Sequence, residues 1–193
     1  MVDRAAEIRH PGEFRDVYYR VYREPPYCED AAIADEFAER LVGHAALSGF
    51  SLTTVLDDGV LTGFAYGVRL EEGRWHPRAA APAPQGLRWP LFYIYELAVV
   101  PELRGRGHGR ELLDLLLADR AEPFAVLAAS NQAPARELYR RWGWAKVGEL
   151  TEPPKGVDLL ALPLRLMKSE ERSATPGTAD RADVVFDRSD QLG

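Results

Sequence analysis

A glycine-rich segment in the middle of the chain has the composition of an anion-binding loop. Residues 104–110 read Arg-Gly-Arg-Gly-His-Gly-Arg, after an apolar run that ends at Pro101 and before a segment rich in leucine. Glycines at alternate positions let backbone N–H groups approach a bulky anion, because no side chain stands in the way. A helix that begins here adds free N–H donors and a positive end, and Arg104 and Arg106 add charge-assisted contacts. This combination predicts a pyrophosphate site.

Two common pyrophosphate-binding motifs do not fit the loop. A Walker loop requires Lys followed by Ser or Thr after its glycines, whereas Gly109 is followed by Arg110 and Glu111. A dinucleotide site places its glycines in the first strand–helix–strand unit. Here the loop lies in mid-chain after several predicted strands, and its glycines are one residue too close together. A loop that only joins a strand to a helix is the remaining alternative, and the arginine, proline and helix in register argue against it.

One carboxylate, Glu96, interrupts the apolar run of residues 91–100. An unpaired buried carboxylate is costly, so we expect Glu96 to be either functional or paired with an arginine. Strand alternation puts Tyr93, Tyr95 and Leu97 on one face and Glu96 on the other. If the odd-numbered face lines a substrate site, Tyr93 and Tyr95 contact the substrate and a water relay removes its proton.

The remaining sequence predicts alternating strands and helices around these groups. Gly63 and Gly67 indicate a bulge or a close backbone approach within a strand, and Asp57-Asp58-Gly59 is typical of a hairpin. Residues 71–90, rich in proline, predict a long loop that is either a lid or a surface excursion. The predicted elements are helices at 12–23, from 29 to Gly43 or Gly49, after Gly109 and around 135–142, and strands at 50–56, 60–70, 91–100, 124–128, 144–150 and 157–164.

Composition restricts the class of protein. The 193 residues, 46% hydrophobic, are enough for one domain with a proper core. A net charge of −6 argues against general nucleic-acid binding, and no apolar run or leader-like start predicts a membrane segment or export. Cys28 is the single cysteine, so we expect no disulfide framework, no metal site and a cytoplasmic location. The scattered histidines His10, His44 and His76 are expected to be solvated.

Two motifs together resemble the GNAT family of N-acetyltransferases. The pattern Arg104-x-x-Gly107-x-Gly109, preceded by Leu97-x-Val99-x-Pro101, is similar to the family's acyl-CoA loop, and residues 128–144 are similar to its later strand–helix motif. The resemblance covers residues 5–165. It implies an α+β fold with a central mixed, twisted sheet of six to seven strands, flanked by about four helices and with a short first strand near Ile8. We expect this domain to occupy residues 1–167 and residues 168–193 to form a disordered tail.

The resemblance also implies a co-substrate, acetyl-CoA, and the residues that bind it. Backbone groups at the end of the fourth strand would hold the pantetheine and thioester, and N–H groups from Gly105 through Arg110 would hold the pyrophosphate. Many members of the family have a cofactor-contacting asparagine seven residues before a tyrosine of the strand–helix motif. The tyrosine corresponds to Tyr139 here, and the asparagine position is Gln132, preceded by Asn131. The cofactor-binding residues implied are Leu97, Ala98, Val99, Arg104, Gly105, Arg106, Gly107, His108, Gly109, Arg110, Asn131 and Gln132.

Catalytic and acceptor residues follow from the same resemblance. Tyr139 matches the tyrosine that protonates the departing thiolate in many members, although its place on an apolar helix stripe also suits a core residue. The string Ile94-Tyr-Glu-Leu-Ala-Val99 resembles that of aminoglycoside 3-N-acetyltransferases, whose acidic residue meets the substrate amine, and this makes Glu96 the candidate base. Glu24 and Tyr27 lie where the fold shapes its acceptor pocket, unless Glu24-Pro-Pro-Tyr27 is only a helix-breaking corner.

These features predict transfer of an acetyl group from acetyl-CoA to a primary amine by direct attack in a ternary complex. The expected acceptor is a small cationic molecule of the aminoglycoside or polyamine type, because the chain is acidic and Tyr27, Tyr93 and Tyr95 could contact a protonated amine. Two alternatives are a protein or peptide acceptor and a non-catalytic acyl-CoA sensor. No nucleic-acid or membrane partner is expected, and a homodimer is left open.

Overall fold

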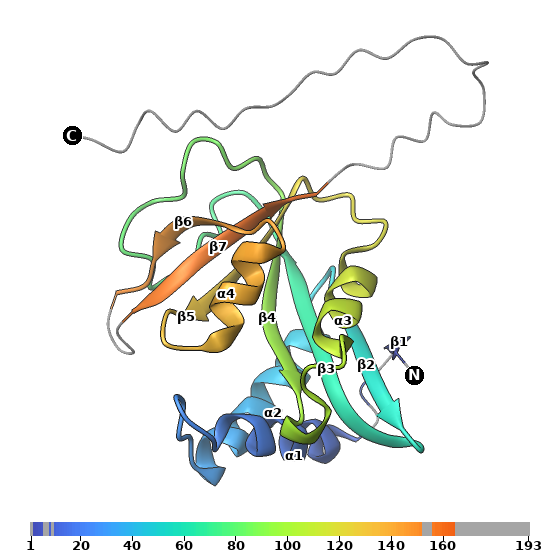
Figure 1. Cartoon of the computed structure of the whole chain (residues 1–193). Coiled ribbons are helices and arrows are strands. Elements are labelled where there is room, and N and C mark those ends of the chain that lie inside the picture. The colour runs from blue at the N-terminus through green and yellow to red at the C-terminus, as the bar shows by residue number, and fades with distance from the viewer. Residues whose placement is uncertain (1, 6–7, 9, 152–155, 165–193) are drawn as a thin grey trace, which may run out of the picture.

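The computed structural model describes residues 2–5, 8, 10–151 and 156–164, so the expected tail at 168–193 lies outside the described residues. One seven-stranded sheet runs through the molecule in the order β1-β2-β3-β4-β5-β7-β6 (Figure 1). The pair β4–β5 is parallel, and the other neighbours are antiparallel. The strands are β1 (Val2–Ala5), β2 (Ser51–Asp57), β3 (Val60–Leu70), β4 (Leu91–Val99), β5 (Phe124–Ser130), β6 (Ala145–Glu149) and β7 (Val157–Pro163).

The helices begin at residues suited to helix starts. Pro11 opens α1 (Pro11–Tyr22) and Pro134 opens α4 (Pro134–Arg141), because the missing N–H of proline costs nothing in a first turn. Asp30 caps α2 (Ala31–Ala45) by accepting from the N–H of Ile33. A 3₁₀ turn (Pro101–Leu103) leads to α3 (His108–Leu117). The element order matches the prediction, except that the short first strand lies at Val2–Ala5 rather than near Ile8.

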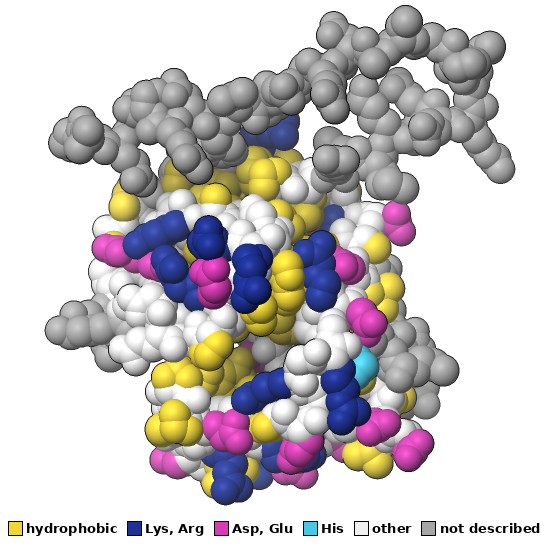
Figure 2. Space-filling model, in the orientation of Figure 1, with side chains coloured by type: hydrophobic (Ala, Val, Ile, Leu, Met, Phe, Trp, Pro, Cys, Tyr) yellow, Lys and Arg dark blue, Asp and Glu magenta, His cyan; other side chains and the backbone are white. Residues whose placement is uncertain are grey.

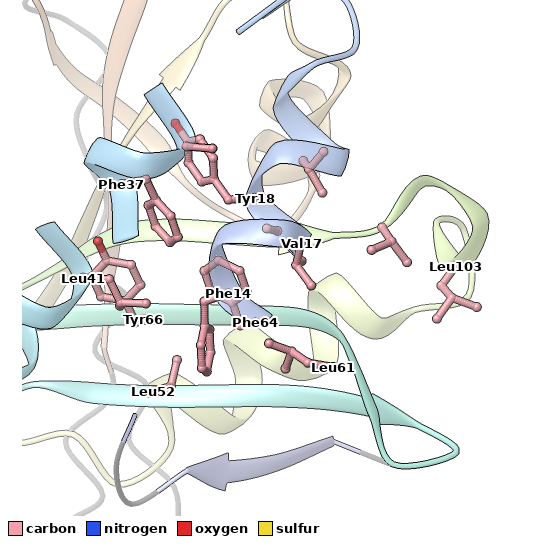
Figure 3. Packing of buried hydrophobic residues seen from close by; sticks show 14 residues of the cluster. Phe14, Val17, Tyr18, Phe37, Leu41, Leu52, Leu61, Phe64, Tyr66 and Leu103 are labelled. Carbon is pink, nitrogen blue, oxygen red and sulfur yellow. The ribbon is translucent and has the colours of Figure 1, made fainter. Parts of the chain in front are cut away.

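The helices cover both faces of the sheet. Aromatic and aliphatic side chains of α1 and α2 pack on β2 and β3 in the core of Figure 3, where Phe14 meets Phe64 edge to face at 5.2 Å between ring centroids. On the other face, α3 and α4 pack through leucines and Tyr139 against β4 and β5. Each face therefore buries one of the alternating side-chain sets of the central strands.

Strands β4 and β5 separate after a short paired stretch. Their parallel register runs only from Leu91 opposite Phe124 to Ile94 opposite Leu127. Beyond that point β4 continues along β3 and β5 continues along β7. Figure 1 shows the two strands diverging between α3 and α4. The opening exposes backbone that a continuous sheet would have used for hydrogen bonds.

A bulge at Tyr95 overturns the predicted alternation along β4. Tyr66 of β3 pairs with Glu96 and Gly67 pairs with Ile94, so Tyr95 has no opposite residue. An extra residue in one strand reverses the alternation beyond it. Tyr93, Tyr95 and Glu96 consequently share the face that α1 and α2 cover, and the expectation that Glu96 points to the opposite face was wrong.

The loop of residues 71–90 is fastened to the far end of the sheet. Ala79 forms a bridge with Leu150, and the N–H of Ala80 donates to the carbonyl of Glu149 at 2.9 Å. Trp75 donates its indole N–H to the carbonyl of Ala81 at 3.1 Å. The loop thus forms a wall over the β5–β7 end rather than a free surface excursion.

The bulge depends on Gly67. A Cβ at this position would lie 2.6 Å from both the Tyr93 carbonyl oxygen and Cζ of Phe92. Gly67→Ala should therefore lower the free energy of unfolding by about 1–3 kcal/mol, as overpacking does. The matched control Gly43→Ala, in α2 with nothing within 4 Å of its Cβ, should raise that free energy by about 0.5–1 kcal/mol. Urea denaturation compares the two, and an unchanged midpoint for Gly67→Ala would contradict the close approach.

Candidate active site

Two adjoining cavities occupy the opening between β4 and β5. The first, here called the loop cavity, has a volume of about 450 Å³ and is bordered by the glycine-rich loop, α1 and α4. The second, the tyrosine cavity, has a volume of about 620 Å³ and lies under α1, β4 and the 71–90 loop. They meet at shared lining residues: Tyr22, Pro26, Tyr27, Leu97, Ala135 and Tyr139. A molecule in one cavity can therefore reach a molecule in the other.

The glycine-rich loop presents open backbone to the loop cavity. Gly105 and Gly107 have φ of 75° and 92°, in the left-handed region that favours glycine. A Cβ on Gly105, Gly107 or Gly109 would meet nothing within 4 Å, so the loop borders empty space rather than packed protein. The first N–H groups of α3 have no intrahelical acceptor, and they lie at this border. Arg110 is an exception to the prediction, because its N–H already donates to the Gly107 carbonyl at 2.9 Å.

Some of the charged side chains predicted around the loop line a cavity, and the others do not. Arg104 and His108 line the loop cavity, and Arg104 also pairs with Glu24 at 2.9 Å. Glu24 lines neither cavity, so the structure places it on Arg104 rather than against an acceptor. Arg106 lies away from both cavities and donates to the Glu102 carbonyl at 3.4 Å.

Residues at the end of β4 alternate between the two faces of the sheet. Leu97 lines both cavities and Val99 lines the loop cavity. Ala98 instead packs into the core under α1, and its register partner is Phe64. Of the two candidate amides after β5, Gln132 lines the tyrosine cavity. Asn131 instead packs against Gly156, and a Cβ built on Gly156 would lie 2.6 Å from the side-chain amide of Asn131. Only Gln132 of the pair borders a cavity.

Tyr139 lies at the junction of the two cavities. Its side chain is 7% exposed, and its ring packs edge-on against Trp142 and Trp144 at 5.9 Å and 5.8 Å between centroids. Among the described residues, no buried side-chain oxygen or nitrogen lacks a hydrogen-bond partner. Burial raises the pKa of Tyr139, so the phenol is protonated at neutral pH. The residue is both part of the core and a protonated phenol at the junction.

Glu96 faces the tyrosine cavity and accepts a hydrogen bond from the hydroxyl of Tyr22. Burial, as the largest cause, raises the pKa of Glu96 to about 7, and repulsion from Glu29 acts in the same direction. The Tyr22 hydrogen bond and the backbone N–H of Leu97 stabilise the carboxylate and limit the rise. A carboxyl group with a pKa near neutrality is suited to accept a proton at neutral pH.

A second carboxylate and several tyrosines complete the tyrosine cavity. Glu29 lines it and accepts from the Tyr18 hydroxyl at 2.6 Å. Tyr22 packs between Tyr18 and Tyr27, at 4.4 Å and 4.7 Å between centroids. On the β4 side, Tyr93 and Tyr95, both predicted as substrate contacts, line the cavity, and their ring centroids lie 4.8 Å apart. The cavity lining is aromatic and includes two carboxyl groups, Glu29 and Glu96, together with the guanidinium of Arg78 on the 71–90 loop.

Two histidines expected to be solvated are instead packed against tyrosines. His44 stacks on Tyr95 at 4.1 Å and contacts the Tyr66 hydroxyl at 3.2 Å, and His76 lines the tyrosine cavity beside Tyr93. Burial lowers the pKa of both histidines. His10 is exposed, as predicted.

The sequence did not identify Tyr22 and Glu29 as residues of the candidate site. Tyr22 lies in the helix predicted at 12–23, and Glu29 begins the next predicted helix. A stripe with tyrosines at 18 and 22 next to a carboxylate at 29 was the available signal, because buried phenols require hydrogen-bond partners.

The part of the chain that the structure describes contains neither a cluster of potential metal ligands nor a membrane-spanning helix. Within residues 2–5, 8, 10–151 and 156–164, no three His, Cys, Asp or Glu side chains gather as metal ligands would. No helix in this part of the chain has the length and apolar character needed to cross a bilayer.

Comparisons with known proteins agree with this architecture. Mycothiol acetyltransferase from Thermomonospora curvata is 32% identical over 139 residues, which make up 67% of this chain and 41% of that protein. The chain thus spans about two fifths of that relative's length.

Solved structures have the same fold. The PaiA N-acetyltransferase from Thermoplasma acidophilum, in complex with coenzyme A, has a TM-score of 0.59 at 12% identity, over 84% of this chain and 99% of that one. A GNAT-family acetyltransferase from Streptococcus agalactiae has a TM-score of 0.59 at 12% identity, over 84% of this chain and 95% of that one. The model of the acetyltransferase (GNAT) family matches residues 12–144. The chain belongs to the GNAT acetyltransferase family.

Proposed function

We propose that the chain transfers an acetyl group from acetyl-CoA to a primary amine of a small cationic molecule, by direct attack within a ternary complex. The observation that carries this proposal is the position of Glu96. It lies in a cavity that joins the loop cavity at Tyr139, so a proton acceptor and a proton donor flank one junction. The family uses acetyl-CoA as its acyl donor, which supplies an activated thioester.

The loop cavity suits this donor. Open N–H groups at residues 105–109 and the positive end of α3 would hold the diphosphate, and Arg104 would add a charge-assisted contact. The backbone at Leu97 and Val99 has no partner on β5, because β5 diverges, and it would hold the pantetheine arm by strand-like hydrogen bonds. Ala98 would take part only through its backbone.

Glu96 would accept the proton that the attacking amine must lose. A protonated amine cannot attack a carbonyl, because its lone pair is occupied. The shared face of Tyr93, Tyr95 and Glu96 lets the carboxylate contact the acceptor from the tyrosine cavity, so the water relay expected from strict alternation is unnecessary. Tyr139 would then donate the proton that the leaving thiolate needs.

A cationic acceptor fits the charge and aromatic character of the tyrosine cavity. Glu29 and Glu96 supply two carboxylates, and the faces of Tyr27, Tyr93 and Tyr95 attract cations. His76 and Arg78, both on the 71–90 loop, line the same cavity, so the loop closes the side along which we expect an extended peptide to run. These features favour a small molecule over a protein acceptor.

Binding of acetyl-CoA through the loop can be tested with Gly107→Glu. The new carboxylate would occupy the open face of the loop and repel the diphosphate. Acetyl-CoA should raise the melting temperature of the parent protein but not of this variant, since a ligand stabilises only the form it binds. Gly59→Glu is the control, because Gly59 has a similar φ of 80° at an exposed hairpin. No shift for the parent at millimolar ligand would refute the proposal.

The roles of Glu96 and Tyr139 differ in their pH dependence. Because the base must be unprotonated, kcat/KM should rise with pH through about 7, the pKa of Glu96. Glu96→Gln should lower kcat/KM by roughly 10²–10⁴-fold and abolish this limb. Tyr139→Phe should lower kcat, whereas the rise of kcat/KM with pH through about 7 and the affinity for acetyl-CoA should remain. A pH profile of Glu96→Gln that matches the parent would exclude Glu96 as the base.

The acceptor class can be tested by measuring thiol release with aminoglycosides, polyamines, amino acids and short peptides. We expect turnover with small cationic amines. Glu29→Gln should raise their KM, whereas Glu39→Gln, an exposed change of equal charge on α2, should not. Turnover with peptides alone would overturn the acceptor while leaving the acetyltransferase intact. Binding of acetyl-CoA without thiol release for any amine would favour a sensor.

A further inference from the structure

The carboxyl group of Glu96 is held by a tyrosine from a different layer of the fold. Its Oε1 atom, on β4, accepts a hydrogen bond from the hydroxyl of Tyr22, the last residue of α1. The backbone N–H of Leu97 donates to the same carboxyl group. A carboxylate offers about four lone-pair sites. The two donors therefore fix its position and leave it able to accept a further hydrogen bond from the tyrosine cavity, which Glu96 lines.

The ring of Tyr22 is itself held on both sides. It lies between the rings of Tyr18 and Tyr27, whose centroids are 4.4 Å and 4.7 Å away. Tyr18 in turn stacks on Phe37 of α2 at 4.1 Å between centroids, and Figure 3 shows these two side chains next to each other in the core. This packing restricts the Tyr22 ring, so its hydroxyl is presented in a fixed direction.

Tyr22 keeps its proton at neutral pH. Burial, as the largest cause, and the charge of Glu96 raise the pKa of Tyr22 well above its usual range. The residue lines both cavities, and Figure 2 shows the surface hollowed between α4 and α1, beside them. Glu96 thus meets a lasting hydrogen-bond donor at the place where acceptor and acyl donor would meet.

The other titratable and charged groups around Glu96 do not replace this contact. On α2, Glu29 raises the pKa of Glu96 by repulsion and Arg40 lowers it by attraction. Among the described side chains that influence Glu96, the Tyr22 hydroxyl is the one that bonds to it. The remaining groups are phenols whose pKa values are raised by burial and by the charge of Glu96, namely Tyr18, Tyr27, Tyr66, Tyr93 and Tyr139.

We propose that Tyr22 is a positioning residue for the reaction, whose hydroxyl holds the carboxyl group of Glu96 in the direction of the acceptor amine. The proposal rests on the proposed function, in which Glu96 is the base. Tyr22 then acts through Glu96 and transfers no proton itself. Because a hydrogen bond to the charged form of a carboxyl group lowers its pKa, the same contact also keeps Glu96 available as a carboxylate near neutral pH.

NMR titration of the Glu96 carboxyl group tests the contact without any ligand. The full chain carries glutamate labelled with ¹³C at the carboxyl carbon, and the signal missing from Glu96→Gln is that of Glu96. Tyr22→Phe keeps the ring and removes the hydroxyl, so the midpoint, about 7 in the parent, should rise by about one pH unit. Tyr19→Phe, on the same helix but outside both cavity linings, should leave it unchanged. A midpoint that does not move in Tyr22→Phe would overturn the proposal.

A double-mutant cycle distinguishes positioning of Glu96 from a purely structural role. Thiol release is measured with the amine that reacts fastest in the acceptor screen, for the parent, Tyr22→Phe, Glu96→Gln and the double variant. In the parent background, Tyr22→Phe should lower kcat/KM at pH 7 by roughly tenfold and move its rise toward alkaline pH. In the Glu96→Gln background it should cause no further loss, because a residue that acts through Glu96 has no carboxylate left to position.

The outcomes separate this proposal from the proposed function. An equal loss of kcat/KM in both backgrounds would overturn the positioning role, because Tyr22 would then act independently of Glu96. If no amine releases thiol from acetyl-CoA, the proposed function fails, whereas the NMR midpoint still decides whether Tyr22 holds Glu96.

Discussion

The separation of β4 from β5 is the constraint on which the site depends. Parallel strands in a continuous sheet satisfy each other's N–H and C=O groups, and these two do so only from Leu91 to Ile94. Each strand keeps its outer neighbour, β3 or β7, so the opening forms without unravelling the sheet. The backbone at Leu97 and Val99, which has no partner on β5, then borders a cavity that is wide enough for a ligand. Helices α3 and α4, which follow the two diverging strands, necessarily form the sides of that cavity.

The bulge at Tyr95 turns this opening into an asymmetric site. Before the bulge, Tyr93 faces α1 and the 71–90 loop, and beyond it Glu96 faces the same side. Leu97 lies on the opposite face and lines both cavities, whereas Glu96 lines only the tyrosine cavity. A single unpaired residue therefore puts these two neighbours on opposite faces of one strand. Gly67 permits this arrangement, since a side chain there would overlap Tyr93 and Phe92.

Local patterns in the sequence were sufficient to predict most of the fold. Helical stripes, the hairpin at Asp57-Asp58-Gly59 and the glycine-rich loop are determined by neighbouring residues, and their positions agree with the structure to within a few residues. The bulge could be suspected from Gly67, but its partner residue could not, because register depends on two strands distant in sequence. The same holds for Tyr22 with Glu96: seventy-four positions separate them, and only the packing of α1 on β4 brings them together. Helical spacing likewise could not distinguish Trp142 at the wall of the loop cavity from Trp142 in a core.

The ionisation of Glu96 is a balance that several elements set together. Burial under α1 and the charge of Glu29 at the start of α2 raise its pKa, while the Tyr22 hydroxyl and the Leu97 N–H lower it. If burial acted alone, the carboxyl would stay protonated at neutral pH and could not accept a proton. If further hydrogen bonds to the carboxylate lowered the pKa of Glu96, the group would be too weak a base to deprotonate an ammonium ion. The approach of a cationic acceptor adds positive charge beside Glu96 and favours its carboxylate form. A cavity that would attract a cationic amine would thus also prepare the group that deprotonates it.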